Sequence, residues 1–221
     1  MTTFDDPAAV AAYADKPRRL VPGHDALLAM TDLLLAEQMP PHGHLFVLGA
    51  GGGLEMTLFA RNHPDWHFTG VDPSAEMLAL AVKTMGDNAT RATLITGYVH
   101  DAPDGPYDAA TCILTLHFVP RAERVPTLQA LRTRLKPGAT FVCAHHSVPD
   151  TNRTQWFTRF AAFAEMNGID SHDIRKGASR MATELPILSP TEDEALLHQA
   201  GFSQITQFYH ALTFRGWVCT A

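Results

Sequence analysis

Short apolar runs alternate along the chain with longer stretches in which apolar residues recur every three or four positions. The longer stretches predict three helices: one that ends at about Asn62, one over 74–86 and one over 121–135. The third is expected to bend or restart at Pro126. Apolar strands that alternate with helices are typical of a parallel sheet covered on both faces. The runs that predict strands lie at 45–48, 67–72, 92–99, 108–116 and 139–146, the last after a turn at 136–138.

Further helices are predicted before and after this alternating region. Residues 25–38 have helical spacing and precede a double proline, so we expect residues 1–40 to form an N-terminal helical extension. Residues 151–186 are expected to be a helical insertion, too short to be a domain. The motif Ser-Pro-Thr-Glu at 189–192 is a capping box, and it predicts a helix that Gly201 ends.

Two more strands are expected at the end of the chain, over 203–212 and 212–221, as an antiparallel pair at one sheet edge. Together with the five apolar runs they give seven strands. The handedness rule for crossover connections then predicts a single doubly wound, Rossmann-like α/β domain over residues 1–221. Its sheet is mainly parallel with the last strand antiparallel, and helices cover both faces.

Composition and charge narrow the class of protein. Of the 221 residues 46% are hydrophobic, which excludes a disordered chain. The net charge of −6 argues against a nucleic acid as partner. No apolar stretch approaches the roughly 20 residues of a membrane span, and the start MTTFDDPAAV is acidic where a secretory signal is basic. Three cysteines in apolar runs, at 112, 143 and 219, predict buried thiols and a cytoplasmic location.

A glycine cluster follows the first predicted strand directly. Gly49, Gly51 and Gly53 form a G-x-G-x-G pattern, and Leu54 stands where the dinucleotide fingerprint needs its last glycine. Such a turn either lets a ligand approach the backbone closely or is simply tight. Asp72 ends the second strand, where a carboxylate can accept both ribose hydroxyls of an adenosine; alternatively it caps the next helix.

The runs VLGAGGGL, GVDPSAEML and LKPG, taken together, resemble the class I S-adenosylmethionine-dependent methyltransferases over about residues 40–145. The resemblance implies S-adenosylmethionine as cofactor and methyl transfer as the reaction. The family usually carries an acidic residue two positions before the first glycine, where this chain has Val47. The resemblance therefore does not say how the methionine ammonium is held.

The segments RLVPGH at 19–24, LTLHF at 114–118 and LHQAGF at 197–202 are similar to the carboxy-S-adenosylmethionine synthase branch of this superfamily. That branch carries tyrosine, aspartate, asparagine and arginine where this chain has His24, Tyr98, Ile113 and Ala178. Ala178 lacks the cation that pairs with a carboxylated cofactor, so we expect ordinary S-adenosylmethionine to be bound. The resemblance implies cofactor contacts at His24, Gly49, Ala50, Gly51, Asp72, Pro73, Tyr98, Val99 and Ile113.

Chemical arguments also bear on Arg19, Tyr98 and Tyr13 as candidates for contacts with the cofactor. Arg19 could pair with the methionine carboxylate, or could be an exposed arginine without a partner. Tyr98 can stack on the adenine or be core, while the Val99 backbone remains available to the adenine edge. Tyr13 could lie over the sulfonium, although a packing role is the better interpretation.

Histidines follow two of the predicted strands at the edge where open α/β sheets bind ligands. His117 follows the fourth strand, and His145 and His146 end the fifth. A neutral imidazole there could act as general base, although structural roles account for these residues equally well. Adjacent residues on a strand point to opposite faces, so His145 and His146 do not form a metal site, and none is expected.

The insertion carries Trp156, Phe157, Phe160, Phe163 and Met166 at helical spacing. This face could be core, the surface of a homodimer, or a lid over an apolar substrate pocket. Residues 151–183 carry five basic and three acidic side chains, which is too small an excess of positive charge to indicate RNA binding.

The sequence predicts a transferase that methylates a small molecule, without membrane or nucleic acid partners. One alternative is an enzyme like the carboxy-S-adenosylmethionine synthases of tRNA wobble-uridine modification. The other is a non-catalytic S-adenosylmethionine binder.

Overall fold

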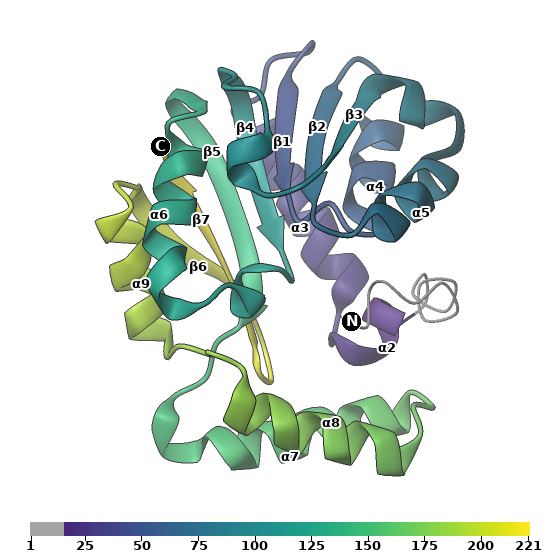
Figure 1. Cartoon of the computed structure of the whole chain (residues 1–221), viewed down its shortest axis with the longest axis vertical. Coiled ribbons are helices and arrows are strands. Elements are labelled where there is room, and N and C mark those ends of the chain that lie inside the picture. The colour runs from purple at the N-terminus through teal and green to yellow at the C-terminus, as the bar shows by residue number, and fades with distance from the viewer. Residues whose placement is uncertain (1–15) are drawn as a thin grey trace.

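The computed structural model describes residues 16–221, which contain one seven-stranded sheet in the order β3-β2-β1-β4-β5-β7-β6 (Figure 1). All neighbouring strands are parallel except that β7 runs antiparallel to both β5 and β6. This confirms the predicted doubly wound α/β fold. The strands are β1 (His44–Leu48), β2 (His67–Asp72), β3 (Ala92–Thr96), β4 (Tyr107–Ile113), β5 (Leu135–His146), β6 (Ser203–Ala211) and β7 (Phe214–Thr220).

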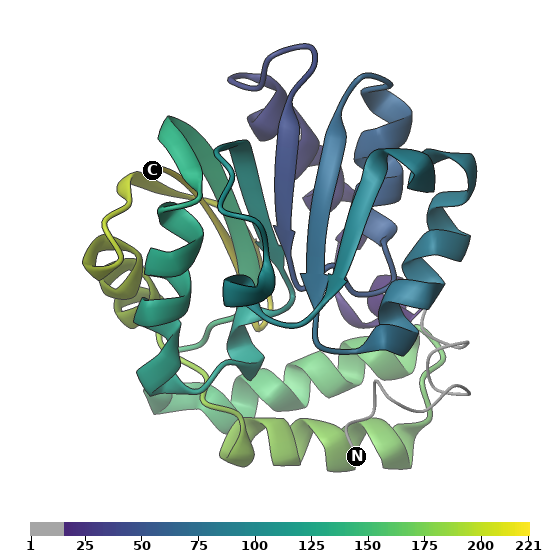
Figure 2. The same ribbon diagram turned by 45° about the horizontal axis from the view of Figure 1, so that its top comes forward.

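Helices cover both faces of the sheet and one of its ends. Helices α3, α4 and α5 pack on one face and α6 and α9 on the other, so that the sheet separates two apolar cores. Helices α2, α7 and α8 lie beyond the carboxyl ends of β1, β2 and β4 (Figures 1 and 2). The bounds are α2 (Lys16–Leu20), α3 (His24–Ala36), α4 (Leu54–Asn62), α5 (Ala75–Met85), α6 (Arg121–Arg132), α7 (Arg153–Met166), α8 (Ser171–Glu184) and α9 (Pro190–Gln199).

The helix ends follow from local side chains. The Ser74 hydroxyl accepts a hydrogen bond from the Met77 amide and begins α5. Helix α9 begins with the predicted capping box, because the Ser189 hydroxyl and the Glu192 carboxylate each accept from the other's amide. Gly201, at a φ of 96°, follows the end of α9.

Three details differ from the sequence prediction. Helix α6 continues through Pro126, which deprives the helix of only the hydrogen bond to the Ala122 carbonyl. Strand β5 already begins at Leu135, opposite Tyr107, and the expected turn at 136–138 is an irregularity within it. Strand β3 ends at Thr96, because Gly97 at a φ of 152° turns the chain before Tyr98.

A buried polar cluster joins β5 to the two helices on its outer face. The Asp193 carboxylate of α9 lies 3.7 Å from the Arg124 guanidinium of α6 and 3.2 Å from the His145 imidazole. All three side chains are almost fully buried. Attraction between the Asp193 carboxylate and the Arg124 guanidinium offsets part of the cost of taking these two charges out of water, and the cluster links α6, α9 and β5.

None of the helices within residues 16–221 is both long and apolar enough to span a lipid bilayer.

The three cysteines lie on adjacent strands. Cys112 on β4 is opposite Cys143 on β5, and Cys219 lies on β7. All three are buried free thiols, and burial raises the pKa of Cys112 to about 12. We expect a thiol reagent to modify none of them rapidly in the native protein and all three after denaturation. Rapid modification of the native protein would contradict these strand positions.

Candidate functional site

The turn between β1 and α4 can only be formed by glycine at two of its positions. Gly49 and Gly53 have φ values of 79° and 77°, which side chains disfavour. A Cβ atom on Gly49 would overlap the Thr115 side chain, and one on Gly53 would lie 2.9 Å from the Ala81 backbone. These contacts bring the turn against the end of β4 and α4 against α5. The backbone amides at the start of α4 therefore face the carboxyl edge of the sheet.

Asp72 connects this turn to the neighbouring strand. One carboxylate oxygen accepts a hydrogen bond from the Gly51 amide at 2.9 Å, and the other accepts from the Ser74 amide at 2.9 Å. Burial raises the pKa of Asp72, and the two amide hydrogen bonds counteract that shift. Ser74, and not Asp72, is the N-cap of α5, so the alternative role of Asp72 as that cap is wrong. Each oxygen retains a lone pair that could accept a ribose hydroxyl.

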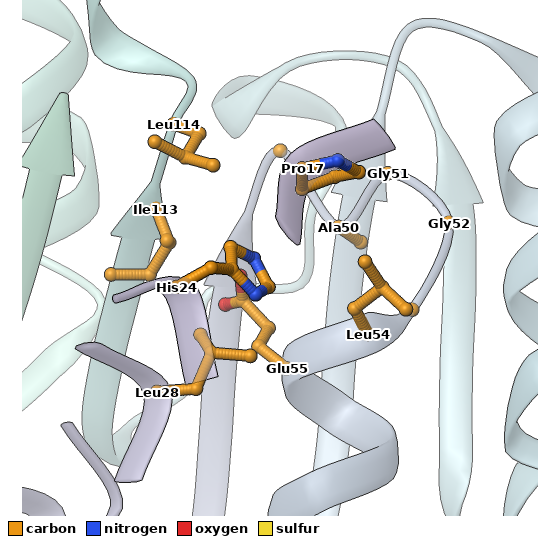
Figure 3. Close-up of a pocket in the computed structure, with 12 residues that line it drawn as sticks. Pro17, His24, Leu28, Ala50, Gly51, Gly52, Leu54, Glu55, Ile113 and Leu114 are labelled. Atoms are coloured by element: carbon orange, nitrogen blue, oxygen red, sulfur yellow. The ribbon is translucent and has the colours of Figure 1, made fainter. Parts of the chain in front are cut away.

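A pocket that opens to solvent lies at the glycine turn. Figure 3 shows His24 entering it from α3, Glu55 from the first turn of α4, and Ile113 from the end of β4. The glycines carry no side chain and leave backbone exposed to an occupant of this pocket, which suits a cofactor held at the turn. Its lining residues are Pro17, His24, Leu28, Gly49, Ala50, Gly51, Gly52, Gly53, Leu54, Glu55, Ile113 and Leu114.

Glu55 is a site residue that the sequence analysis missed. Its side chain is only 7% exposed, and its carboxyl accepts a hydrogen bond of 2.6 Å from the Thr111 hydroxyl. Burial raises the pKa of Glu55 to about 7, although this hydrogen bond acts in the opposite direction. The available signal was its position in the chain, two residues after the glycine cluster.

Leu114 shows backbone strain at the opposite wall of the pocket. It has a φ of 57°, which is rare for a branched side chain, and its amide donates to the Ala144 carbonyl at 2.6 Å. Backbone strain of this kind is typical of ligand sites. No local sequence pattern signals this conformation.

The structure brings five of the predicted cofactor residues together and leaves five outside the pocket lining. Asp72 adjoins the lining through Gly51. Tyr98 is 67% exposed, which excludes its core alternative, and Val99 is buried in the next short turn. Those in the lining are His24, Gly49, Ala50, Gly51 and Ile113; those outside it are Arg19, Asp72, Pro73, Tyr98 and Val99.

Arg19 has partners at the far end of α7. Its guanidinium donates to the backbone carbonyls of Asn167 and Gly168. This contact joins α2 to the C-terminus of α7, so the alternative of an arginine without a partner is wrong. A role toward the methionine carboxylate stays a prediction, and Tyr13 lies outside the described residues.

The three candidate histidines are all buried and fall on both faces of the sheet. His117 and His146 lie on the α7 side with ring centroids 4.8 Å apart, and His146 also stacks on Phe214. Burial holds the pKa of His117 well below its usual value and lowers that of His146 to about 3, so both are neutral. His145 points to the other face and contacts Asp193. The opposite orientations of His145 and His146 were predicted; catalysis by any of the three stays a prediction.

Comparison with known proteins identifies relatives along almost the whole chain. A family model described as a methyltransferase domain matches residues 46–138. A carboxy-S-adenosyl-L-methionine synthase from Chromohalobacter salexigens is 30% identical over 224 residues, covering 98% of this chain and 82% of that protein.

Solved structures of methyltransferases have a similar fold. An O-methyltransferase family protein from Burkholderia thailandensis superposes with a TM-score of 0.72 at 16% identity, covering 99% of this chain and 61% of that one. Human N-acetylserotonin methyltransferase in complex with S-adenosylmethionine gives a TM-score of 0.58 at 16% identity, covering 96% and 58%.

Replacing Asp72 by alanine should weaken binding of S-adenosylmethionine by about 1.5–3 kcal/mol, because two ribose hydroxyls would lose their charged acceptor. Calorimetric titration measures the change. The matched control is Ser74→Ala, which removes the cap of α5 and should lower stability by about 1 kcal/mol with affinity retained. Unchanged affinity in Asp72→Ala would disprove the ribose assignment.

The raised pKa of Glu55 should make stability depend on pH. Between pH 4.5 and 7 the folded protein keeps a proton that the unfolded chain has released, so this residue lowers stability as pH rises through that window. Relative to the wild type, Glu55→Gln should therefore gain up to about 3 kcal/mol between pH 5 and pH 8. Urea denaturation at the two pH values measures this. The control Glu123→Gln, at an exposed first-turn position of α6, should show no such gain in stability between the two pH values. If Glu55→Gln also showed no gain, the raised pKa of Glu55 would be refuted.

Proposed function

Because the chain belongs to the class I S-adenosylmethionine-dependent methyltransferases, we propose that it methylates a small-molecule acceptor. Its cofactor is S-adenosylmethionine, which supplies an already activated methyl group. The task of the protein is then to hold cofactor and acceptor in line, and a general base is needed only for an acceptor that carries a proton. The glycine turn and Asp72 would hold the adenosine half.

The observation that carries the proposal is the cover over the carboxyl edge of the sheet. Helices α7 and α8 cross this edge (Figure 2). Phe157 and Phe160 of α7 pack into the same core as the pocket residue Leu28. Phe157 and Phe160 are thus core residues, as one alternative for this apolar face required, and we propose that residues 151–186 also serve as a lid over this edge. An acceptor that reaches the cofactor beneath such a cover has to be small.

The charges on α7 and α8 favour a small molecule over RNA. Arg175 pairs with Glu165, Arg180 pairs with Glu184 at 3.0 Å, and Arg153 pairs with Asp150. Arg159 lies over the Trp156 ring, 4.5 Å from its centroid. Most of the basic groups in this segment thus have partners within the chain, and a phosphate backbone would have to compete with those carboxylates.

The carboxy-S-adenosylmethionine synthase reaction is the second candidate, favoured by the 30% identical relative. The residue that distinguishes this reaction from ordinary methyl transfer is the one at which the resemblance requires an arginine. Ala178 is buried on α8 against α7, and Arg180, the nearest substitute along the chain, is exposed and paired with Glu184. Neither side chain is available to a buried carboxylate, which supports ordinary S-adenosylmethionine.

We also propose a cytoplasmic location and leave a homodimer as a prediction. The three buried thiols suit a reducing compartment. A dimer surface on α7 is supported by Met166, which is 86% exposed. Light scattering determines the oligomeric state.

Purification from cells that make both cofactors tests the main proposal. We expect mass spectrometry of the bound ligand to find S-adenosylmethionine or its demethylated product. A predominance of the carboxylated form would replace the proposal by the second candidate. Methyl transfer from labelled cofactor to a pool of metabolites should also be detected, and tight cofactor binding without any transfer would indicate a non-catalytic binder.

A further inference from the structure

Glu55 is a buried acid, and in the part of the chain that the structure describes no positively charged side chain lines the pocket beside it. Apart from His24, the pocket lining contains no basic side chain. Within residues 16–221, the Thr111 hydroxyl supplies the one hydrogen bond that the Glu55 carboxyl accepts. A hydroxyl is a weak counterpart for a buried carboxylate, which normally requires a paired cation. The missing positive charge therefore has to come from a ligand or a proton.

The position of Glu55 relates it to the unusual Val47 of β1. In the parallel pairing of β1 with β4, Val47 lies directly opposite Thr111. Residues opposite each other on neighbouring strands point to the same face of the sheet. The Thr111 side chain thus stands beside that of Val47, and Glu55 reaches it from the first turn of α4. The carboxyl group lies next to the strand position where the family resemblance calls for an acid.

We propose that Glu55 is the acidic residue that binds the ammonium group of the cofactor's methionine moiety. The inference rests on S-adenosylmethionine as cofactor, and it is independent of the identity of the methyl acceptor. The ammonium is a cation of the kind that the pocket lacks. Val47 on β1 cannot bind the ammonium because it carries no charge. Glu55, which lies on α4, performs that function instead.

The neighbouring titratable groups do not supply the countercharge. Burial lowers the pKa of His24 from α3, so its imidazole is neutral at pH 7. Cys112 on β4 stays a neutral thiol, since burial and the nearby Glu55 raise its pKa. Glu55 with a pKa of about 7 is therefore substantially protonated at neutral pH in the free protein. An ammonium beside it favours the ionised form, so cofactor binding should release a proton.

Two probes separate this contact from the rest of the cofactor. S-adenosylhomocysteine carries the ammonium but no sulfonium, and 5′-methylthioadenosine lacks the whole amino acid part. In calorimetric titrations at pH 7.5, Glu55→Gln should bind S-adenosylhomocysteine about 10- to 100-fold more weakly than the wild type. Its affinity for 5′-methylthioadenosine should stay within about twofold. Glu123→Gln, from the exposed first turn of α6, should match the wild type with both ligands.

Proton release gives a second readout that a packing role would not change. Titration of S-adenosylhomocysteine at pH 6 in two buffers of different ionisation enthalpy should show nearly one proton released by the wild type. The same measurement should show none for Glu55→Gln, and little for the wild type at pH 8.5. The glutamine keeps the size of the side chain and can still accept from Thr111, so the variant retains the local packing.

Each other outcome overturns a particular statement. Equal loss of both ligands in Glu55→Gln would make Glu55 a structural residue of the turn. Weakened S-adenosylmethionine with unchanged S-adenosylhomocysteine would place the carboxylate at the sulfonium instead. Failure of the wild type to bind any of the three ligands would refute the cofactor assignment itself.

Discussion

The parallel, in-register pairing of β1 with β2 and β4 is the constraint on which the site depends. Leu48 lies opposite Val71 on β2, and Val47 opposite Thr111 on β4, so the three strands end close together. The Gly49 and Ala50 amides continue this alignment, because both donate to the Val71 carbonyl at 2.8 and 2.9 Å. The glycine turn, Asp72 and the end of β4 therefore meet at one edge, although they are widely separated along the chain.

The buried carboxylates of this molecule differ in whether other groups of the chain compensate their charge. Asp193 has Arg124 and His145 beside it, and Asp72 accepts two backbone amides. The chain itself thus compensates these two carboxylates. Glu55 has only a hydroxyl, and desolvation consequently dominates its pKa. A buried group whose charge the chain leaves uncompensated is a marker of function with a physical cause.

The departures from the synthase resemblance fall on three separate parts of the fold. His24 and Ile113 line the pocket at the glycine turn, whereas Ala178 lies between α7 and α8. Tyr98 stands exposed beyond β3. Under the proposed function, the chain therefore combines a glycine turn and Asp72 that would hold an adenosine with altered residues at other cofactor positions. This pattern is consistent with relatives that use one scaffold for different transfers.

The sequence by itself determined the sheet, its layers and the glycine turn with Asp72. Their signals are local: apolar runs, helical spacing, a capping box and glycines directly after a strand. It also predicted that His145 and His146 point to opposite faces, since alternation is a property of any strand. These inferences needed no knowledge of which strands are neighbours.

Only the tertiary structure decided which polar groups are buried and what faces them. The register of β1 against β4 sets Thr111 beside Val47, and only then does Glu55 of α4 become part of the site. The same holds for Arg19, whose partners lie 148 and 149 residues further along the chain, and for Leu114, strained against Ala144 of β5. The pKa of a carboxyl and the strain of a backbone depend on neighbours brought close by folding, and local sequence patterns carry no information about them.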